Sequence, residues 1–157
     1  MQCSLARGLE LIGDWWSPLL VRDLYLGVTR FDDLVEDLGI SRNLLTRRLQ
    51  ALIRNGVIER MAYQSRPTRY EYRLTEAGRD LVPVIMALTE WGDRWAQPKE
   101  GSPILFTHKT CGHRFRPQVT CPECGEAIRS DTVIARPGPG GAAKRGTMVV
   151  AKRLRRA

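Results

Sequence analysis

The sequence predicts a mainly α-helical domain with a small β hairpin, followed by a linker and a second, much smaller unit. Leucine, isoleucine and valine recur at helical spacing through much of residues 5–95. Two β-branched and aromatic runs, 57–63 and 69–74, flank a short polar turn and indicate the hairpin. Beyond a stretch rich in proline and glycine, three of the four cysteines lie between Cys111 and Cys124.

These composition shifts set the expected boundaries. The length of 157 residues suits one good-sized domain plus a small unit. We expect a main domain at 1–97, a linker at 98–103, a small unit at 104–135 and a basic tail at 136–157. The tail contains few residues that could form a core, so we expect it to be disordered.

The net charge of +8 is unevenly distributed along the chain. Seven of these charges lie in the acid-free tail, which leaves +1 for the first 135 residues. The tail could attract DNA phosphates without sequence preference, or it could serve only solubility. The sequence has no membrane-spanning stretch and no signal-peptide pattern, so we expect a soluble, cytoplasmic protein without membrane contact. In that compartment the cysteines indicate metal or redox chemistry before structural disulfides.

Four helices are expected before the hairpin. Ser17 and Pro18 form a typical helix start, and Thr29 could cap the next helix. The expected helical ranges are 1–12, 17–26, 31–38 and 42–54. The last two are joined by a tight turn containing Gly39, as in a helix-turn-helix.

The fourth helix has an apolar face and a basic face. Ser41 can cap it, and Leu45, Leu49 and Leu52 share the side that would face the core. The opposite side has donors and positive charge but no acid: Asn43, Arg47, Gln50 and Arg54, with Arg42 and Thr46 near the start. Arg can bind guanine, Asn adenine, and Thr a thymine methyl, which is typical of a DNA recognition helix. The plainer interpretation is an amphipathic helix with a solvated basic face.

The hairpin and the helix after it complete a winged helix-turn-helix. Arg66 and Arg69 lie at or beside the hairpin turn, where they could contact a phosphate backbone or a minor groove, or simply be solvated. A long helix follows from Thr75 to about Gln97, with a broad apolar side. That side requires a partner, and a symmetric dimer is the simplest one.

With these elements in place, a series of short motifs can be followed along residues 3–95. They are an N-terminal Cys3, Ile12-Gly-x-x-Trp16, Arg30-Phe31-x-x-Leu34, Ile40-Ser41-x-x-x-Leu45-x-x-x-Leu49-x-x-Leu52, Gly56-Val57-Ile58-x-Arg60, Pro67, Tyr72-x-Leu74-Thr75-x-x-Gly78 and Trp91-Gly92. Taken together, they resemble the HxlR-type winged helix-turn-helix regulators, relatives of the MarR group. The resemblance implies a homodimer joined through its terminal helices that binds a pseudo-palindromic operator in the cytoplasm. The chain departs from the common pattern at Ser4 and at Asp14-Trp15, which affects effector or redox sensing more than DNA binding.

The small unit has a metal-ligand pattern. His108-x-x-Cys111-Gly and Cys121-x-x-Cys124-Gly share one spacing, and two such turns supply four ligands for a tetrahedral zinc ion. His113 is the alternative fourth ligand. The pattern predicts a structural zinc in a unit that resembles a truncated zinc ribbon.

The sequence favours a non-catalytic, sequence-specific DNA-binding regulator. We expect Arg42, Asn43, Thr46 and Arg47 to contact bases, Ser41 and Arg48 to contact phosphates, and Arg66 and Arg69 to hold the wing. A small-molecule or redox effector fits the resemblance, with Cys3 as the candidate redox sensor. One alternative is a zinc-ribbon protein-docking module on a winged scaffold. A weaker one is a thiol oxidoreductase using Cys121 and Cys124, for which no accompanying catalytic group is present.

Overall fold

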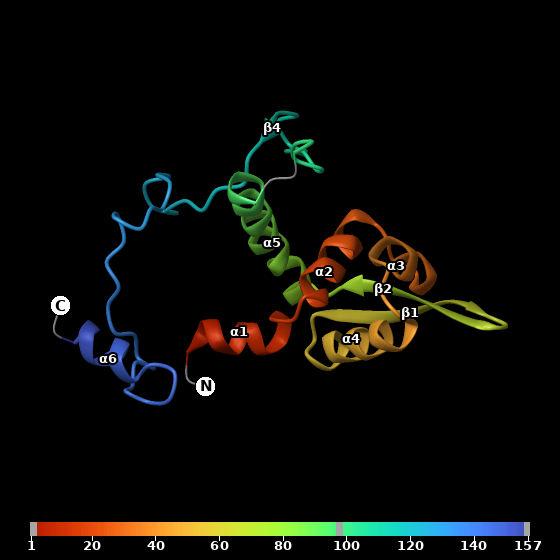
Figure 1. Cartoon of the computed structure of the whole chain (residues 1–157), viewed down its shortest axis with the longest axis horizontal. Coiled ribbons are helices and arrows are strands. Elements are labelled where there is room, and N and C mark those ends of the chain that lie inside the picture. The colour runs from red at the N-terminus through yellow and green to blue at the C-terminus, as the bar shows by residue number, and fades with distance from the viewer. Residues whose placement is uncertain (1–2, 97–98, 156–157) are drawn as a thin grey trace. The chain divides into compact units, whose positions relative to one another are not determined.

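The computed structural model describes residues 3–96 and 99–155. The expected helix start at Met1, the helix end near Gln97, the first linker residue Pro98 and Arg156 in the tail lie outside these residues. The described part is mainly helical with a small antiparallel hairpin, which confirms the predicted fold class (Figure 1). Its elements are α1 (Ser4–Ile12), α2 (Trp16–Leu26), α3 (Phe31–Leu38), α4 (Arg42–Arg54), β1 (Ile58–Ser65), β2 (Thr68–Leu74), α5 (Glu76–Trp95), β3 (Phe106–Thr107), β4 (Arg114–Phe115) and α6 (Met148–Leu154).

The chain forms two compact units. One comprises Met1–Arg79 with Ile134–Ala157, and the other comprises Asp80–Val133. The first contains the winged helix-turn-helix, and the second contains most of α5 and the cysteine-rich segment. No helix within residues 3–96 or 99–155 is long and apolar enough to cross a membrane.

The core of the winged domain lies where α2, α3 and α4 meet the base of the hairpin. Leucine supplies most of it because leucines at helical spacing place their side chains on one face of each helix. Full burial of each such side chain is worth about 1.5–3 kcal/mol, so this shared core sets the positions of the helices. The buried apolar residues of this core are Leu20, Val21, Leu24, Leu34, Ile40, Leu45, Leu49, Leu52, Val57, Ile58 and Tyr72.

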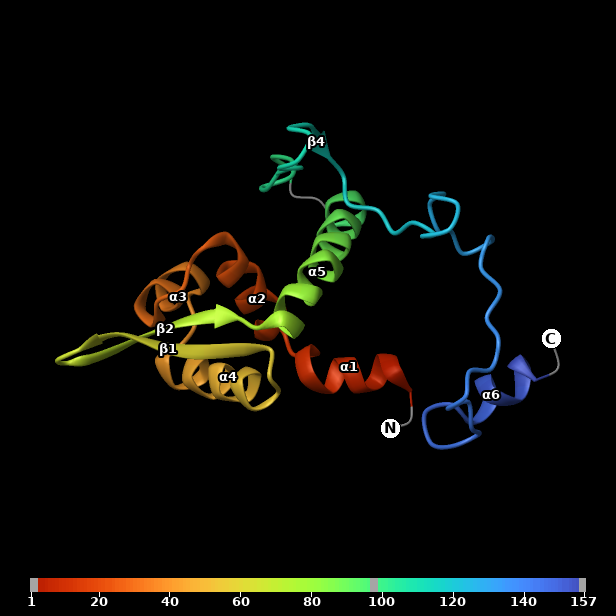
Figure 2. The same ribbon diagram turned by 180° about the vertical axis from the view of Figure 1, so that it is seen from behind.

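The hairpin forms a wing, and the segment before α3 makes an isolated β-bridge to its second strand. β1 and β2 pair antiparallel from Ile58↔Leu74 to Ser65↔Thr68, with a register shift between Ala62 and Gln64. The segment before α3 joins β2 through the N–H of Tyr72, which donates to the carbonyl of Thr29 at 2.9 Å, and through an Arg30↔Glu71 bridge. Both ribbon views show the turn end of the hairpin extending beyond α3 and α4 (Figures 1 and 2).

Two helix starts differ from the sequence expectation. α2 begins at Trp16, and the carboxylate of Asp14 caps it by accepting from the N–H groups of Trp16 at 2.9 Å and Ser17 at 3.1 Å. Ser17 is therefore inside the helix, and its hydroxyl donates to the same carboxylate. The N-cap of α3 is Arg30, and the carbonyl of the preceding Thr29 accepts from the N–H of Tyr72 in β2.

The start of α5 packs closely against the end of α4. The hydroxyl of Thr75 accepts from the N–H of Gly78 at 3.2 Å and donates to the carbonyl of Gly56 at 2.6 Å. Gly78 is buried, and a Cβ added there would lie 2.1 Å from the carbonyl oxygen of Val57. The close approach therefore requires glycine at this position.

The tail differs from the expected disorder at one segment. Residues Met148–Leu154 form helix α6, and Ala151 is buried with 7% of its surface exposed. The hydroxyl of Thr147 donates to the carbonyl of Ala142 at 2.7 Å just before this helix. The short apolar run Met148-Val149-Val150, in an otherwise polar tail, lies in the first turn of the helix.

Candidate nucleic-acid interface

Helix α4 has the cap and the buried face that the sequence predicts. The hydroxyl oxygen of Ser41 accepts from the N–H of Leu44 at 3.4 Å, and Asn55 ends the helix. Leu45, Leu49 and Leu52 are buried with at most 1% of their surfaces exposed. Since this face is fixed in the core, the opposite face must point outward.

The outward face of α4 is polar and carries no acid. Asn43, Arg47, Gln50 and Arg54 are all exposed. Thr46 is also exposed, and its hydroxyl donates to the carbonyl of Arg42 at 2.9 Å. The sequence-predicted base-contacting side chains of Asn43, Thr46 and Arg47 therefore have access to solvent.

Arg42 is held by helix α3. Its guanidinium lies 2.8 Å from the carboxylate of Asp32 and 5.0 Å from the ring centre of Phe31. The side chain is still 65% exposed, so this contact is on the surface and is worth at most about 1 kcal/mol. The two contacts join the start of α4 to the start of α3.

Arg48 contacts the cap of α2. Its buried Nε lies 3.3 Å from the Oδ1 atom of Asp14, while the side chain as a whole is 36% exposed. No local sequence pattern predicts this contact, because the two residues are far apart along the chain. Arg48 thus joins helix α4 to the start of α2.

Several groups converge on the carboxylate of Asp14. Its partial burial by itself would raise its pKa. The hydrogen bonds from the Ser17 side chain and from the backbone of Trp16 and Ser17, with the charge of Arg48, outweigh burial and hold the pKa of Asp14 below its usual value. Asp14 is therefore ionised in the folded protein over the whole neutral range.

A second carboxylate, Asp23, lies buried between α2 and α3. It is 1% exposed and 2.6 Å from the guanidinium of Arg22, which also lies 3.3 Å from Asp37 on α3. Burial raises the pKa of Asp23, and Arg22 opposes that shift. Sequence reasoning missed this group, because an Asp within an apolar helical run gives no indication of its partner. It helps to fix α3, the first helix of the helix-turn-helix.

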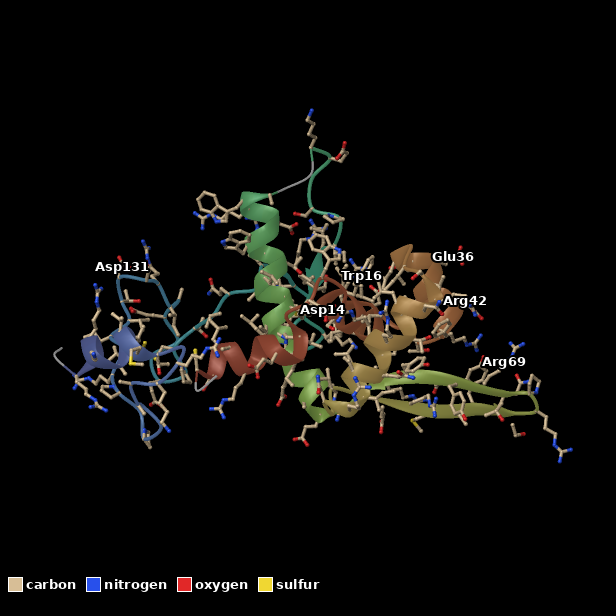
Figure 3. The ribbon with its side chains drawn as sticks, turned by 60° about the horizontal axis from the view of Figure 1, so that its bottom comes forward. Asp14, Trp16, Glu36, Arg42, Arg69 and Asp131 are labelled. Carbon is tan, nitrogen blue, oxygen red and sulfur yellow. The ribbon has the colours of Figure 1, made fainter. Side chains whose placement is uncertain are left out.

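The wing presents arginine near its turn. Arg66 and Arg69 are exposed, and Figure 3 shows Arg69 near the turn end of the hairpin. The Gln64 side-chain amide donates to the carbonyl of Arg66 at 2.9 Å, and the Thr68 hydroxyl donates to the carbonyl of Ser65 at 3.2 Å. These bonds give the short turn a defined shape with its positive charge facing solvent.

Arginines nearer the base of the wing are held against aromatic rings. Arg60 lies 4.1 Å from the ring centre of Tyr70, and Arg30 lies 4.9 Å from that of Tyr63. In such cation–π contacts the guanidinium group is attracted to the face of the aromatic ring, which stabilises the hairpin. The wing arginines that the sequence singled out are therefore distinct from those that stabilise the hairpin.

The predicted metal ligands form two close pairs. The Nδ1 atom of His108 lies 3.4 Å from the Sγ atom of Cys111. Hydrogen bonds from the backbone and side chain of Cys124 and from the backbone of Glu123 lower the pKa of Cys121. Across residues 3–96 and 99–155, no three His, Cys, Asp or Glu side chains are close enough to hold a metal together. Cys3, the predicted redox sensor, is a half-buried free thiol at the N-cap of α1.

Comparison with known families identifies the family to which the winged domain belongs. The model of the HxlR-like helix-turn-helix family matches residues 11–100, which is more than half of the chain. The chain belongs to this family. The resemblance predicted from its motifs is thereby confirmed, and the family is one of transcriptional regulators and not of enzymes.

Relatives of this HxlR-like chain carry names that agree with the family. It is 46% identical over 141 residues to the uncharacterized HTH-type transcriptional regulator Rv3095 of Mycobacterium tuberculosis, covering 90% of this chain and 89% of the relative. A regulator of Synechocystis is 35% identical over 106 residues, covering 67% of this chain and 78% of the relative. The family model ends at residue 100, whereas the mycobacterial match spans 141 residues. This match therefore continues beyond the region of the family model.

Solved structures share the fold. The transcription-factor structure PA1607 superposes with a TM-score of 0.73 at 35% identity, covering 85% of this chain and 94% of that chain. PA1374 from Pseudomonas aeruginosa gives a TM-score of 0.61 at 36% identity, covering 97% and 100%. The redox regulator HypR in its oxidized form gives 0.55 at 32% identity, covering 59% and 96%. The winged helix-turn-helix is thus the shared scaffold.

Proposed function

We propose that this HxlR-like chain is a sequence-specific transcription regulator that binds a pseudo-palindromic operator as a homodimer. The observation that carries the proposal is the outer face of α4, where Asn43, Thr46 and Arg47 are exposed on a helix without an acid. A helix of this kind fits the major groove, which distinguishes all four base pairs. Because operator DNA lies on the chromosome, we expect the chain to act in the cytoplasm.

The residues that we propose to contact DNA fall into three groups. Asn43 and Arg47 have free access to base edges, whereas Arg66 and Arg69 on the wing suit the phosphate backbone or minor groove. Arg42 and Arg48 have partners in the fold, Asp32 and Asp14 respectively. We infer that these two position α4 first, and that any contact with DNA from Arg42 requires it to leave Asp32.

The dimer is proposed from the exposed apolar face of α5. Val84, Leu88, Trp91 and Trp95 recur at helical spacing and are 56%, 55%, 60% and 66% exposed. Such a continuous apolar stripe on one helix marks an interaction surface. A second copy of the chain is the occupant that fits, because a two-fold dimer also presents two α4 helices to a two-fold operator.

The test is a binding titration of the full-length chain on a labelled duplex from upstream of its own gene. We expect two chains per duplex, an affinity that falls steeply with salt, and protected half-sites about 10–10.5 bp apart, centre to centre, or a multiple of that spacing. A duplex of shuffled sequence serves as the control for non-specific binding. Equal affinity for both duplexes, or one chain per duplex at saturation, contradicts the proposal.

A further inference from the structure

The cysteine-rich segment consists of two copies of one hairpin, residues 106–115 and 119–128. In the first copy the N–H of His108 donates to the carbonyl of His113 at 2.9 Å. In the second, the N–H of Cys121 donates to the carbonyl of Glu126 at 2.8 Å. The turns within the two hairpins are therefore closed by the same backbone bond.

The glycines of the two turns also correspond. The N–H of Gly112 donates to the carbonyl of His108, and the N–H of Gly125 donates to that of Cys121, both at 2.8 Å. The two glycines have φ angles of 71° and 74°, in the left-handed region that favours glycine. One turn conformation is thus built twice, from sequences that share only the ligand-x-x-Cys-Gly pattern.

The strands that flank the turns match as well. Phe106 pairs with Phe115 beside the first turn. Beside the second, Thr120 and Ala127 form a bridge, and the N–H of Ile128 donates to the carbonyl of Val119 at 2.9 Å. The correspondence covers all ten residues of each hairpin.

This repeat assigns the fourth ligand. His108 occupies the first position of its turn, as Cys121 does in the second, and Cys111 corresponds to Cys124. His113 corresponds to Glu126, whose carbonyl closes the turn. The open choice between the two histidines is therefore decided by position in favour of His108.

We propose that His108, Cys111, Cys121 and Cys124 bind one zinc ion that joins the two hairpins. In the first turn the imidazole Nδ1 of His108 lies 3.4 Å from the Sγ atom of Cys111. The second turn is closed by the same backbone bonds and holds Cys121 and Cys124 at the equivalent positions. Three sulfurs and one imidazole nitrogen are a standard set for tetrahedral zinc. On binding, the three thiols release their protons to solvent as the metal–sulfur bonds form.

The zinc is structural and its binding is coupled to folding. Leu105, Val119 and Ile128 are 59%, 58% and 46% exposed, so this segment has little core of its own. Among the described residues the two ligand pairs do not form one group of three or more potential ligands. Zinc binding by all four side chains therefore requires the two hairpins to approach each other. Four protein ligands leave no position for water, which excludes a catalytic role for the metal.

The experiment is metal analysis of the full-length chain, purified under reducing conditions without a histidine tag. We expect about one zinc per chain in the wild type. His108→Ala and Cys124→Ser should lose the metal, while the matched control His113→Ala should keep it. Replacing zinc by Co²⁺ should give the visible absorption bands of a tetrahedral thiolate site in wild type and His113→Ala, and not in His108→Ala.

Two outcomes overturn the proposal. If the wild type is isolated reduced with less than about half an equivalent of zinc and takes up no Co²⁺, no site exists. If His113→Ala loses the metal and His108→Ala retains it, the correspondence of the hairpins does not define the ligands. Because the winged domain has its own core, DNA binding by Cys124→Ser is measured separately and reports on the regulator function alone.

Discussion

The side chain of Arg48 on α4 is joined to Asp14, which caps α2, with 3.3 Å between Nε and Oδ1. This relationship couples the helix that we propose to contact DNA to the start of the helix behind it. The aspartate is one of the two places where the chain departs from the common HxlR pattern. Its role here is to complete the end of a helix, which a carboxylate does by satisfying free N–H groups.

Asp14→Asn is expected to lower stability in a pH-dependent way. The folded-state pKa of Asp14 is below the ordinary 3.8, so its charge stabilises the fold above that pH, and this contribution is lost as pH falls through the folded pKa. The expected loss at neutral pH is about 0.3–1 kcal/mol, the usual contribution of a negative charge at a helix N-terminus, because the amide oxygen of Asn can still accept from the N–H groups. Urea unfolding at neutral and acid pH measures it. The exposed Glu36→Gln is the control, expected to stay within ~0.5 kcal/mol. A difference between Asp14→Asn and wild type that is the same at both pH values contradicts the assignment.

Arg47→Ala and Arg66→Ala should weaken DNA binding in different ways. Arg47 faces outward from the recognition helix, so its loss should cost about 1–3 kcal/mol at the operator and relax selection at one base pair. Arg66 lies on the wing, and its loss should weaken operator and shuffled duplexes alike and reduce the salt dependence. Titrations of both duplexes at two salt concentrations separate the two effects. Unchanged affinity in both variants would show that helix and wing are wrongly assigned.

Gly78→Ala should destabilise the winged domain. A Cβ at this position would lie 2.1 Å from the carbonyl oxygen of Val57, so α5 or the strand start must shift. We expect a loss of about 1–3 kcal/mol in free energy of unfolding. The matched control is Gly8→Ala in α1, where a Cβ meets nothing within 4 Å and helix propensity favours alanine. Thermal unfolding of both variants tests the contrast, and equal midpoints would disprove the close approach.

If the proposed dimer forms through α5, Leu88→Glu should convert it into a monomer. Leu88 lies in the middle of the exposed stripe on α5, and a buried charge at a symmetric interface has no partner to offset its desolvation. Leu26→Glu is the control, because Leu26 is 50% exposed on α2 and lies outside the stripe. Light scattering coupled to size-exclusion chromatography gives the mass. Retention of the wild-type mass by Leu88→Glu would place the interface elsewhere.

The sequence by itself determined the type and order of the elements in the winged domain. Leu45, Leu49 and Leu52 lie on one face by spacing alone, and that spacing also fixed which polar residues of α4 face outward. The cap of α4 at Ser41 followed from local chemistry within one turn. Local spacing likewise predicted the two proposed ligand pairs at 108–111 and 121–124, since each pair lies within a single turn.

The tertiary structure decided which residues meet across the chain. The partners of Arg42 and Arg48 lie on α3 and before α2, and no local pattern encodes a contact between charges so far apart in sequence. The capping of α2 by Asp14 instead of Ser17 depended on which side-chain oxygen lies within hydrogen-bonding distance of the free N–H groups of Trp16 and Ser17. Our proposal of His108 over His113 as the fourth ligand rests on backbone bonds that repeat in space, because both histidines lie near Cys111 in the sequence and only His108 occupies the position matched by Cys121.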